Sequence, residues 1–201
     1  MRIIAGQRRG HSIEGLPGRQ LRPTSDLVRE AIFNILRDDV EGRDVLDLFA
    51  GTGALGLEAL SRGASHVIFV ERNRRHAALI RKNLSALRYE DRGTVVTADA
   101  FRWAENYEPL DNQPALVFLD PPYEEYEKRP QRVRQLLHTL ERRLPAGSIL
   151  VVESGRPLTE TVLDQPELWD VRRYGSTVLS LRTLGPTPSE SADEAEPAAE
   201  R

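Results

Sequence analysis

The hydrophobic positions alternate between short apolar runs and longer stretches in which apolar residues recur at helical spacing. The runs predict five strands, at residues 44–48, 66–70, 93–97, 115–119 and 148–153. Helices are expected between them, at residues 54–60, at 73–87, around Trp103 and at 132–144. Strand and helix in alternation predict a doubly wound α/β fold, in which a mostly parallel sheet has right-handed crossovers.

The two ends of the chain depart from this alternation. Residues 169–174 and 177–182, joined by Gly175 and Ser176, predict an antiparallel hairpin at the end of the sheet. At the other end, residues 1–22 predict a small extension built as a β-hairpin, with strands at 2–5 and 11–14.

We therefore expect one main domain between two flanking segments. Thr24 or Ser25 is expected to cap a helix that ends near Arg37 and opens a domain at residues 23–184. Residues 185–201 are rich in Pro, Ala and Glu and hold no large apolar side chain. They predict a disordered acidic tail.

A glycine-rich turn joins the first predicted strand to its helix, in Asp47-Leu48-Phe49-Ala50-Gly51-Thr52-Gly53. Strand–turn–helix units of this kind build a ligand pocket at the carboxyl end of the strand. Glycines let the backbone approach a ligand closely, because they carry no Cβ. The spacing of Gly51, Gly53 and Gly56 also matches the dinucleotide fingerprint. The turn alone therefore leaves open S-adenosylmethionine (SAM), a nicotinamide or flavin, and a purely structural role. Asp47 favours the cationic SAM, because a carboxylate would repel a pyrophosphate.

Three acids, Asp47, Glu71 and Asp99, follow predicted strands at corresponding places. The carboxyl ends of parallel strands line one crevice. There Glu71 has acceptor oxygens for both ribose hydroxyls, and Asp99 has one for the adenine amino group. For any one acid, a plain strand-end cap is an equally good interpretation. The expected cofactor site comprises Asp47, Phe49, Ala50, Gly51, Thr52, Gly53, Glu71, Arg72, Asp99 and Ala100.

Asp120-Pro121-Pro122-Tyr123 follows the fourth predicted strand directly. The prolines lack N–H donors, so this backbone presents only carbonyl acceptors. Asp120 adds another acceptor, and Tyr123 offers a flat ring for stacking. Such a site suits an amino group on a planar ring, whose lone pair preorganised acceptors can direct toward a methyl donor. These four residues are the predicted catalytic site.

Composition narrows the class of protein. The 201 residues include no cysteine, which excludes disulfides and thiolate zinc sites. The histidines, at positions 11, 66, 76 and 138, are scattered, so we expect no metal. No apolar run has the length of a membrane span and no signal peptide is evident, so we expect a cytoplasmic protein, a monomer without membrane contact.

Charge is uneven along the chain, although the net charge is −3. Residues 1–37 carry seven arginines against three acids. A polyanion cannot be held by an acidic crevice, so we expect nucleic-acid phosphates to be bound by the N-terminal extension. The predicted RNA-binding residues are Arg8, Arg9, His11 and Arg22.

The glycine turn together with Asp120-Pro121-Pro122-Tyr123 resembles a class I SAM-dependent amino-methyltransferase. Three further stretches are similar to the bacterial RsmD family of 16S ribosomal RNA guanine-N2 methyltransferases. They are residues 2–10, residues 22–34 and residues 53–64. The resemblance covers residues 1–184 and implies a seven-stranded sheet with an N-terminal hairpin. It also implies SAM as methyl donor, and one guanine of 16S rRNA, in the small subunit or its assembly intermediate, as substrate.

Other hypotheses remain at this point. An amino-methyltransferase acting on DNA adenine or on a protein glutamine shares the same catalytic logic, although Asp120 favours RNA guanine. A nicotinamide oxidoreductase lacks a hydride-transfer site in this sequence. A catalytically idle RNA-binding protein would not need the Asp120–Tyr123 stretch.

Overall fold

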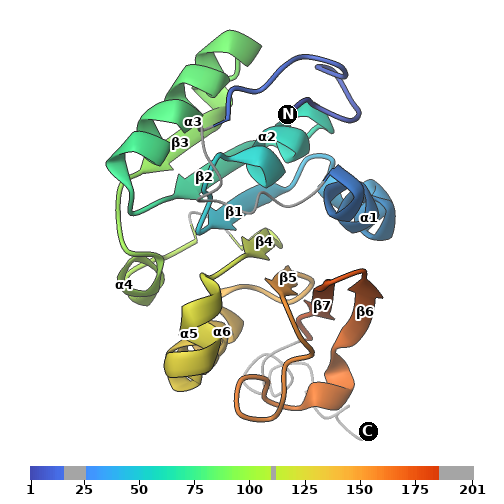
Figure 1. The fold of residues 1–201 in the computed structure, drawn as a ribbon, viewed down its shortest axis with the longest axis vertical. Coiled ribbons are helices and arrows are strands. Elements are labelled where there is room, and N and C mark those ends of the chain that lie inside the picture. Colours follow the sequence, from blue (N-terminus) through green and yellow to red (C-terminus); the bar gives the residue numbers. More distant parts are fainter. Residues whose placement is uncertain (16–25, 110–111, 186–201) are drawn as a thin grey trace, which may run out of the picture.

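One seven-stranded sheet runs through the molecule. The computed structural model describes residues 1–15, 26–109 and 112–185. Its strands are β1 (Asp44–Leu48), β2 (His66–Val70), β3 (Gly93–Val96), β4 (Leu116–Leu119), β5 (Ile149–Ser154), β6 (Asp170–Tyr174) and β7 (Thr177–Thr183). They are ordered β3-β2-β1-β4-β5-β7-β6 (Figure 1). The first five strands pair in parallel, and β7 is antiparallel to both β5 and β6.

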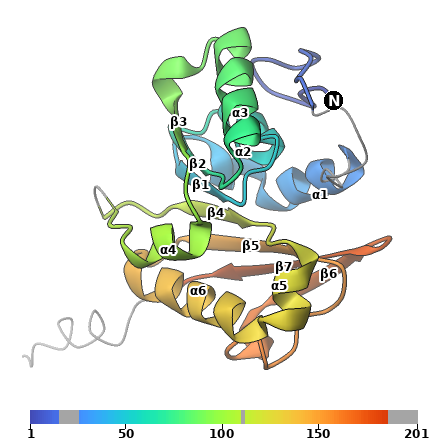
Figure 2. The same cartoon turned by 60° about the vertical axis from the view of Figure 1, so that its left-hand side comes forward.

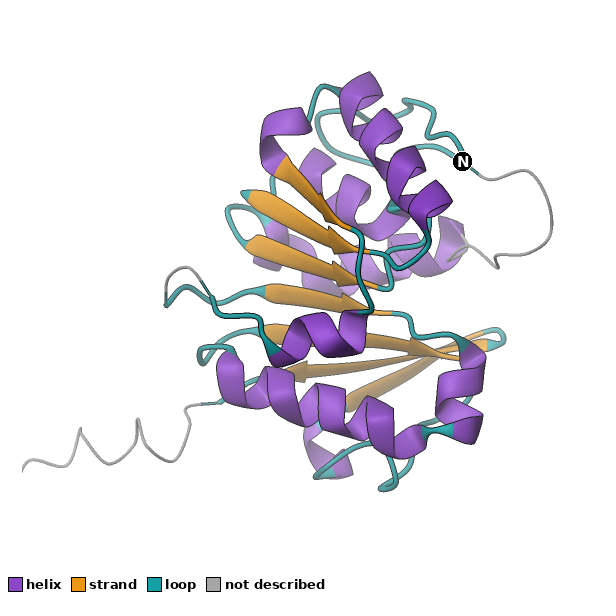
Figure 3. Cartoon of the chain, turned by 90° about the vertical axis from the view of Figure 1, so that its left-hand side faces the viewer, coloured by secondary structure: helices purple, strands orange, loops and turns teal. Residues whose placement is uncertain are grey.

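Helices cover both faces of this sheet, and Figure 3 shows the strands as one twisted layer between them. Figure 2 shows the first three helices on one side and the last three on the other. They are α1 (Asp26–Leu36), α2 (Ala54–Ser61), α3 (Arg74–Leu87), α4 (Ala100–Glu105), α5 (Tyr123–Lys128) and α6 (Pro130–Arg143). Single 3₁₀ turns occur at Arg37–Val40, Glu90–Arg92 and Pro166–Leu168.

The central strands are buried on both faces, as their apolar runs predict. All four residues of β4 are buried, and they alternate between two apolar cores. Phe118 faces α1, where its ring meets Phe33 edge-on at 5.7 Å between ring centroids. Leu119, the next residue, packs in the core beneath α4, α5 and α6. The strands and crossovers predicted from the sequence are confirmed within a residue or two, including the terminal hairpin.

The predicted N-terminal β-hairpin is reduced to a short antiparallel pairing, and its two strands are not formed. Residues 1–15 contain no strand, and a single antiparallel bridge joins Arg2 to Ser12. Around this bridge the Ile13 N–H donates to the Met1 carbonyl at 2.9 Å and the Ile3 N–H to the His11 carbonyl at 3.0 Å, whereas the next residues bond to α2. Both oxygens of Glu58 accept hydrogen bonds, from the N–H groups of Ile4 (2.8 Å) and Ala5 (3.0 Å). The N–H groups of Ile4 and Ala5 are therefore not available to extend the pairing, and the segment is docked on α2 from this point.

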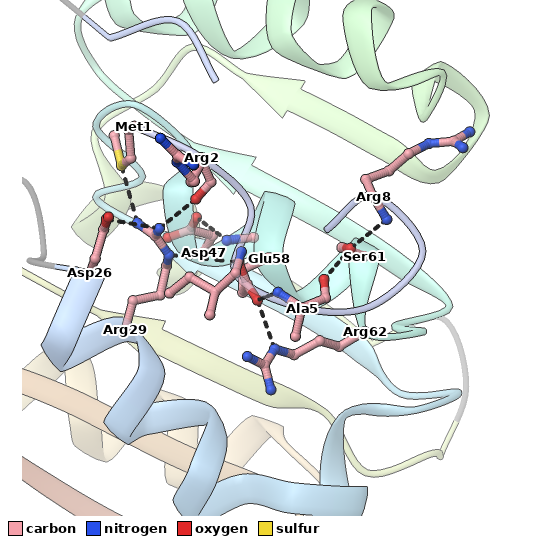
Figure 4. A network of polar contacts seen from close by, with 12 residues as sticks. Met1, Arg2, Ala5, Arg8, Asp26, Arg29, Asp47, Glu58, Ser61 and Arg62 are labelled. Carbon is pink, nitrogen blue, oxygen red and sulfur yellow. Dashed lines mark hydrogen bonds and ion pairs between the residues drawn. The ribbon is translucent and has the colours of Figure 1, made fainter. Parts of the chain in front are cut away.

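Arg29 lies at the centre of this docking (Figure 4). Its side chain is fully buried, and its Nη2 donates to the Arg2 carbonyl at 2.7 Å and to Asp26 at 3.0 Å. Its Nε lies 3.7 Å from Glu58, which is also fully buried. Buried charges are tolerated when paired in this way, and removing one partner is strongly destabilising. The network therefore fixes the N-terminal loop onto α1 and α2.

Some expectations lie outside the described residues. These are the placement of Arg22, the helix cap at Thr24 or Ser25, and all of the acidic tail after Gly185. Across residues 1–15, 26–109 and 112–185, none of the helices combines the length and apolarity that a bilayer crossing requires.

Candidate active site

A cavity of about 580 Å³ opens at the carboxyl edge of the parallel strands. This is the place where open α/β sheets bind ligands. One part of its wall comes from the ends of β1, β2 and β3, and the other from the ends of β4 and β5 and the turn before β7. We call these two parts the loop end and the β4–β5 end of the cavity.

The glycine turn forms the floor of the loop end. Phe49, Gly51 and Gly53 all have positive φ angles, of 67°, 55° and 77°. The N–H groups of Phe49 and Ala50 both donate to the Val70 carbonyl at 3.1 Å, which ties the turn to β2. Gly56 has a different role, because a Cβ there would lie 2.3 Å from the Phe69 ring. It lets α2 pack closely on β2, as the third glycine of such a fingerprint does.

Glu71 lines the loop end and holds the turn in shape. Its Oε2 accepts a hydrogen bond from the Gly51 N–H at 2.8 Å, and its Oε1 accepts one from the Asn73 N–H at 2.7 Å. Each carboxylate oxygen has two acceptor positions, so both remain able to accept from a ligand hydroxyl. The side chain is thereby fixed in one orientation, facing the cavity.

Asp47 is absent from the cavity wall. It is buried beneath the turn, and its Oδ2 accepts a hydrogen bond from the Gly56 N–H at 3.0 Å. Burial raises the pKa of Asp47 to about 7, the Gly56 hydrogen bond acts in the opposite direction, and Glu71 raises it further. The structure therefore places Asp47 behind the site, where it supports the start of α2.

Asp99 lines the cavity and also caps α4, accepting a hydrogen bond from the Arg102 N–H at 3.2 Å. Both of its oxygens accept from Arg132, at 3.1 and 3.2 Å. The same guanidinium lies 4.0 Å from the centre of the Phe101 ring. Phe101 meets Phe49 edge-on at 5.1 Å between centroids. Two aromatic rings and a fixed carboxylate thus form an apolar slot with one polar end.

Asp120, at the β4–β5 end, follows the last residue of β4. Burial raises its pKa well above the usual value, and the charges of Glu153 and Asp47 raise it further. Pro121 and Pro122 carry the chain from Asp120 into α5, where Tyr123 is half exposed at 52%. The Tyr123 ring lies over Gly155, so close that a Cβ on Gly155 would be 3.4 Å from it.

Comparison with known proteins shows the family to which this chain belongs. The profile of the family described as "Conserved hypothetical protein 95" matches residues 1–183. The chain belongs to this family. It is 38% identical over 168 residues to YlbH of Bacillus subtilis, which carries a provisional rRNA methyltransferase name, and the match covers 82% of this chain and 89% of YlbH.

Other relatives carry more specific names. The ribosomal RNA small subunit methyltransferase D of Escherichia coli K12 is 40% identical over 123 residues, which is 61% of this chain and 60% of that protein. A solved structure of yhhF from Escherichia coli, which carries a provisional methyltransferase name, superposes with a TM-score of 0.75 at 32% identity. It covers 93% of this chain and 99% of its own. The fold recurs in an RNA methyltransferase from Salinibacter ruber solved with S-adenosylhomocysteine, with a TM-score of 0.59 at 17% identity over 88% and 97% of the two chains.

The chain is thus a SAM-dependent methyltransferase of this family, with the seven-stranded class I fold. Most of the predicted site residues meet in the one cavity. Those in its wall are Phe49, Ala50, Gly51, Thr52, Glu71, Arg72, Asp99, Ala100, Asp120, Pro121, Pro122 and Tyr123. Asp47 and Gly53 lie outside the wall, where they support the turn and α2.

Sequence reasoning missed several residues of the same wall. Phe101 and His76 lie at the loop end, and Glu153, Ser176 and Thr177 lie at the β4–β5 end. Glu153 had a usable signal, since it is an acid near the end of a predicted strand, as Glu71 and Asp99 are. Ser176 and Thr177 had none, because they reach the cavity only through the pairing of β7 with β5.

Of the predicted RNA-binding residues, the three that the structure describes, Arg8, Arg9 and His11, do not line the cavity. Arg8 donates from Nε to the Leu87 carbonyl at 2.8 Å, at the last residue of α3. His76 of α3 lies in the cavity wall, and Leu87 lies 11 residues further along the helix, which is about 16 Å at 1.5 Å per residue. Arg9 and His11 are exposed on the same loop, and Arg22 is outside the described residues. That these residues bind RNA stays a prediction. Any phosphates bound by Arg8, Arg9 or His11 would lie far from the cavity.

Proposed function

We propose that this protein transfers a methyl group from SAM to the exocyclic N2 amine of a guanine in 16S rRNA, within the small ribosomal subunit or its assembly intermediate. The observation that carries the proposal is the meeting of Asp120-Pro121-Pro122-Tyr123 with the glycine turn in a single cavity. Relatives named for methylation of small-subunit rRNA support this choice of substrate.

The loop end suits the cofactor. Glu71 has acceptor capacity for ribose hydroxyls, and Asp99 has it for an adenine amino group. Phe49 and Phe101 provide aromatic surface for the adenine ring. Arg72 and Ala100 complete the wall, and Asp47 acts from behind through the start of α2.

The β4–β5 end suits the base. When bound, SAM supplies an electrophilic methyl group; its transfer breaks one S–C bond, forms one N–C bond and releases one proton from the amine. Asp120 and the Pro121 carbonyl accept the amine N–H groups and hold the nitrogen lone pair toward the loop end. The half-exposed Tyr123 ring stacks on the base, an interaction worth about 1–3 kcal/mol.

Charge decides where the RNA backbone lies. The cavity wall carries Glu71, Asp99, Asp120 and Glu153, so phosphates must be bound outside it. Arg156 follows the wall residue Gly155, and Arg173 precedes the hairpin turn that holds Ser176. Both arginines are exposed, and neither forms an ion pair with a described acid. We assign the phosphates nearest the target base to these two, and more distant ones to Arg8, Arg9, His11 and Arg22.

A transfer assay tests the function. The full chain is incubated with methyl-labelled SAM and with small or large subunits from cells that lack the enzyme. Label should enter small-subunit RNA alone, and Asp120→Ala should lower the rate by about 10²–10³-fold while SAM affinity is kept. Label in ribosomal protein or in large-subunit RNA would replace this substrate by another. A fully active Asp120→Ala would remove the amino-methylation mechanism.

A further inference from the structure

Glu153 stands beside Asp120 in the wall of the cavity. Leu119 of β4 is the register partner of Val152 of β5, so the next residues of the two strands, Asp120 and Glu153, are neighbours. Neighbouring parallel strands lie about 4.8 Å apart, and residues in register point to the same side of the sheet. Both side chains line the same end of the cavity.

Packing fixes this pair in place. The Tyr126 hydroxyl of α5 donates a hydrogen bond to the Glu153 carbonyl at 2.8 Å, which ties the end of β5 to the helix that follows Asp120. The charge of Glu153 raises the pKa of Asp120, as expected of two carboxyl groups that face one another closely. The pair therefore presents two acceptors side by side. Asp120 is assigned to the substrate amine, whereas no group of the substrate has been assigned to Glu153.

Guanine offers two donors at the matching place. Its Watson–Crick edge carries the N1–H and the N2 amine on adjacent atoms, and enzymes that extract a base from its stack read that edge by hydrogen bonds. Adenine presents its amine beside an N1 lone pair, and cytosine beside an N3 lone pair. A carboxylate facing either lone pair would be repelled.

We propose that Glu153 accepts the N1–H of the guanine whose N2 amine is held by Asp120, and that this contact selects guanine. The inference rests on the proposed function and adds a specificity residue to it. A site built to hydrogen-bond a substrate N–H strongly rejects an analogue that lacks it, because the acceptor gives up water when the base binds and gains no donor in return. Discrimination among bases thus comes from Asp120 and Glu153, whereas Tyr123 can stack on any base and the glycine turn lies at the cofactor end.

The test compares guanine with 2-aminopurine, which keeps the N2 amine but has a lone pair at N1. Small subunits are reconstituted with either base at the methylated position, and kcat/KM is measured for wild type and Glu153→Gln. Wild type should prefer guanine by roughly 100-fold. In Glu153→Gln the side-chain amide can donate to the N1 lone pair, so this preference should fall to about tenfold or less. Glu127→Gln makes the same chemical change on the exposed side of α5 and should keep the wild-type preference.

The outcomes separate this inference from the proposed function. If wild type methylates guanine N2 but treats 2-aminopurine equally well, Glu153 does not read N1 and the inference is overturned, while the function stands. The same follows if Glu153→Gln retains the full preference. The wild-type arm does not depend on any variant folding, and Glu153→Asp, which keeps the charge, should preserve the preference at a lower rate.

Discussion

The Oδ2 atom of Asp47 accepts a hydrogen bond from the backbone N–H of Gly56 at 3.0 Å, in the first turn of α2. Asp47 is buried and outside the cavity wall, so it acts on the site through the helix. Its carboxylate lies near the positive end of the helix dipole, which partly offsets the cost of its burial. This pair therefore links the stability of the fold to the shape of the glycine turn.

Asp47→Asn should remove a pH dependence of stability. The folded-state pKa of Asp47, about 7, is above its ordinary value of 3.8. Its contribution is therefore fully present below about pH 4 and is lost as the pH rises through 7, on the order of 4 kcal/mol in total. The Asn variant can keep the Gly56 hydrogen bond without the charge. In urea unfolding, the free energy of unfolding of Asp47→Asn should rise relative to that of wild type between pH 4.5 and pH 8. A difference that stays constant over this range would show that Asp47 does not titrate as described.

Glu71→Gln should weaken SAM binding. An amide has one acceptor oxygen, so it cannot serve Gly51, Asn73 and the ribose as the carboxylate does. Losing charge-assisted hydrogen bonds should lower affinity by about 10–100-fold in calorimetry. Glu127→Gln serves as the matched control, since Glu127 is exposed on α5. Wild-type affinity in Glu71→Gln would remove Glu71 from the cofactor site.

The pH dependence of turnover should depend on Asp120. Its raised pKa predicts that kcat/KM falls on the acid side at a pH well above that of an ordinary carboxylic acid, because the ionised form is the better acceptor. Asp120→Asn keeps an acceptor oxygen but does not titrate, so it should be slower and should lose this acid limb. An unchanged limb in the Asn variant would assign the titration to another group.

Charge reversal should distinguish the two RNA surfaces. Arg156→Glu and Arg173→Glu lie next to the cavity wall and should weaken subunit binding, flattening its salt dependence by about one unit of slope each. Arg9→Glu tests the N-terminal loop; Arg9 is preferred to Arg8, whose Nε donates to the Leu87 carbonyl. If Arg9→Glu alone changes the slope, the phosphates nearest the base are not held by Arg156 and Arg173. SAM affinity, measured alongside, should stay unchanged in all three.

Local patterns predicted most of the sheet because the parallel strands need only apolar runs bounded by turns. The failures involve residues whose partners are distant in sequence. Ile4 looks like part of a strand, but its N–H binds Glu58, 54 positions away. Arg29 was counted with the N-terminal arginines expected to bind phosphates, but its side chain is fully buried beside Glu58. No periodicity encodes either contact.

In the site, too, local sequence predicted some residues, and contacts between distant residues were missed. The turn and the Asp120–Tyr123 stretch are contiguous in sequence, so their chemistry was readable from it. Asp47 was predicted to contact the cofactor because it lies near the end of the first strand. In the structure its side chain points beneath the glycine turn and accepts a hydrogen bond from the Gly56 N–H. Glu153 is brought to Asp120 by the pairing of β4 with β5, which the alternation of elements does not specify.

The nucleoside that receives the methyl group tests the central claim most directly. After incubation with SAM, small-subunit RNA is digested to nucleosides and analysed by mass spectrometry, with wild type and Asp120→Ala in parallel. We predict one new N2-methylguanosine per RNA in the wild-type sample and almost none with the variant. A methyl group on adenosine, on cytidine or on another atom of guanosine would contradict it.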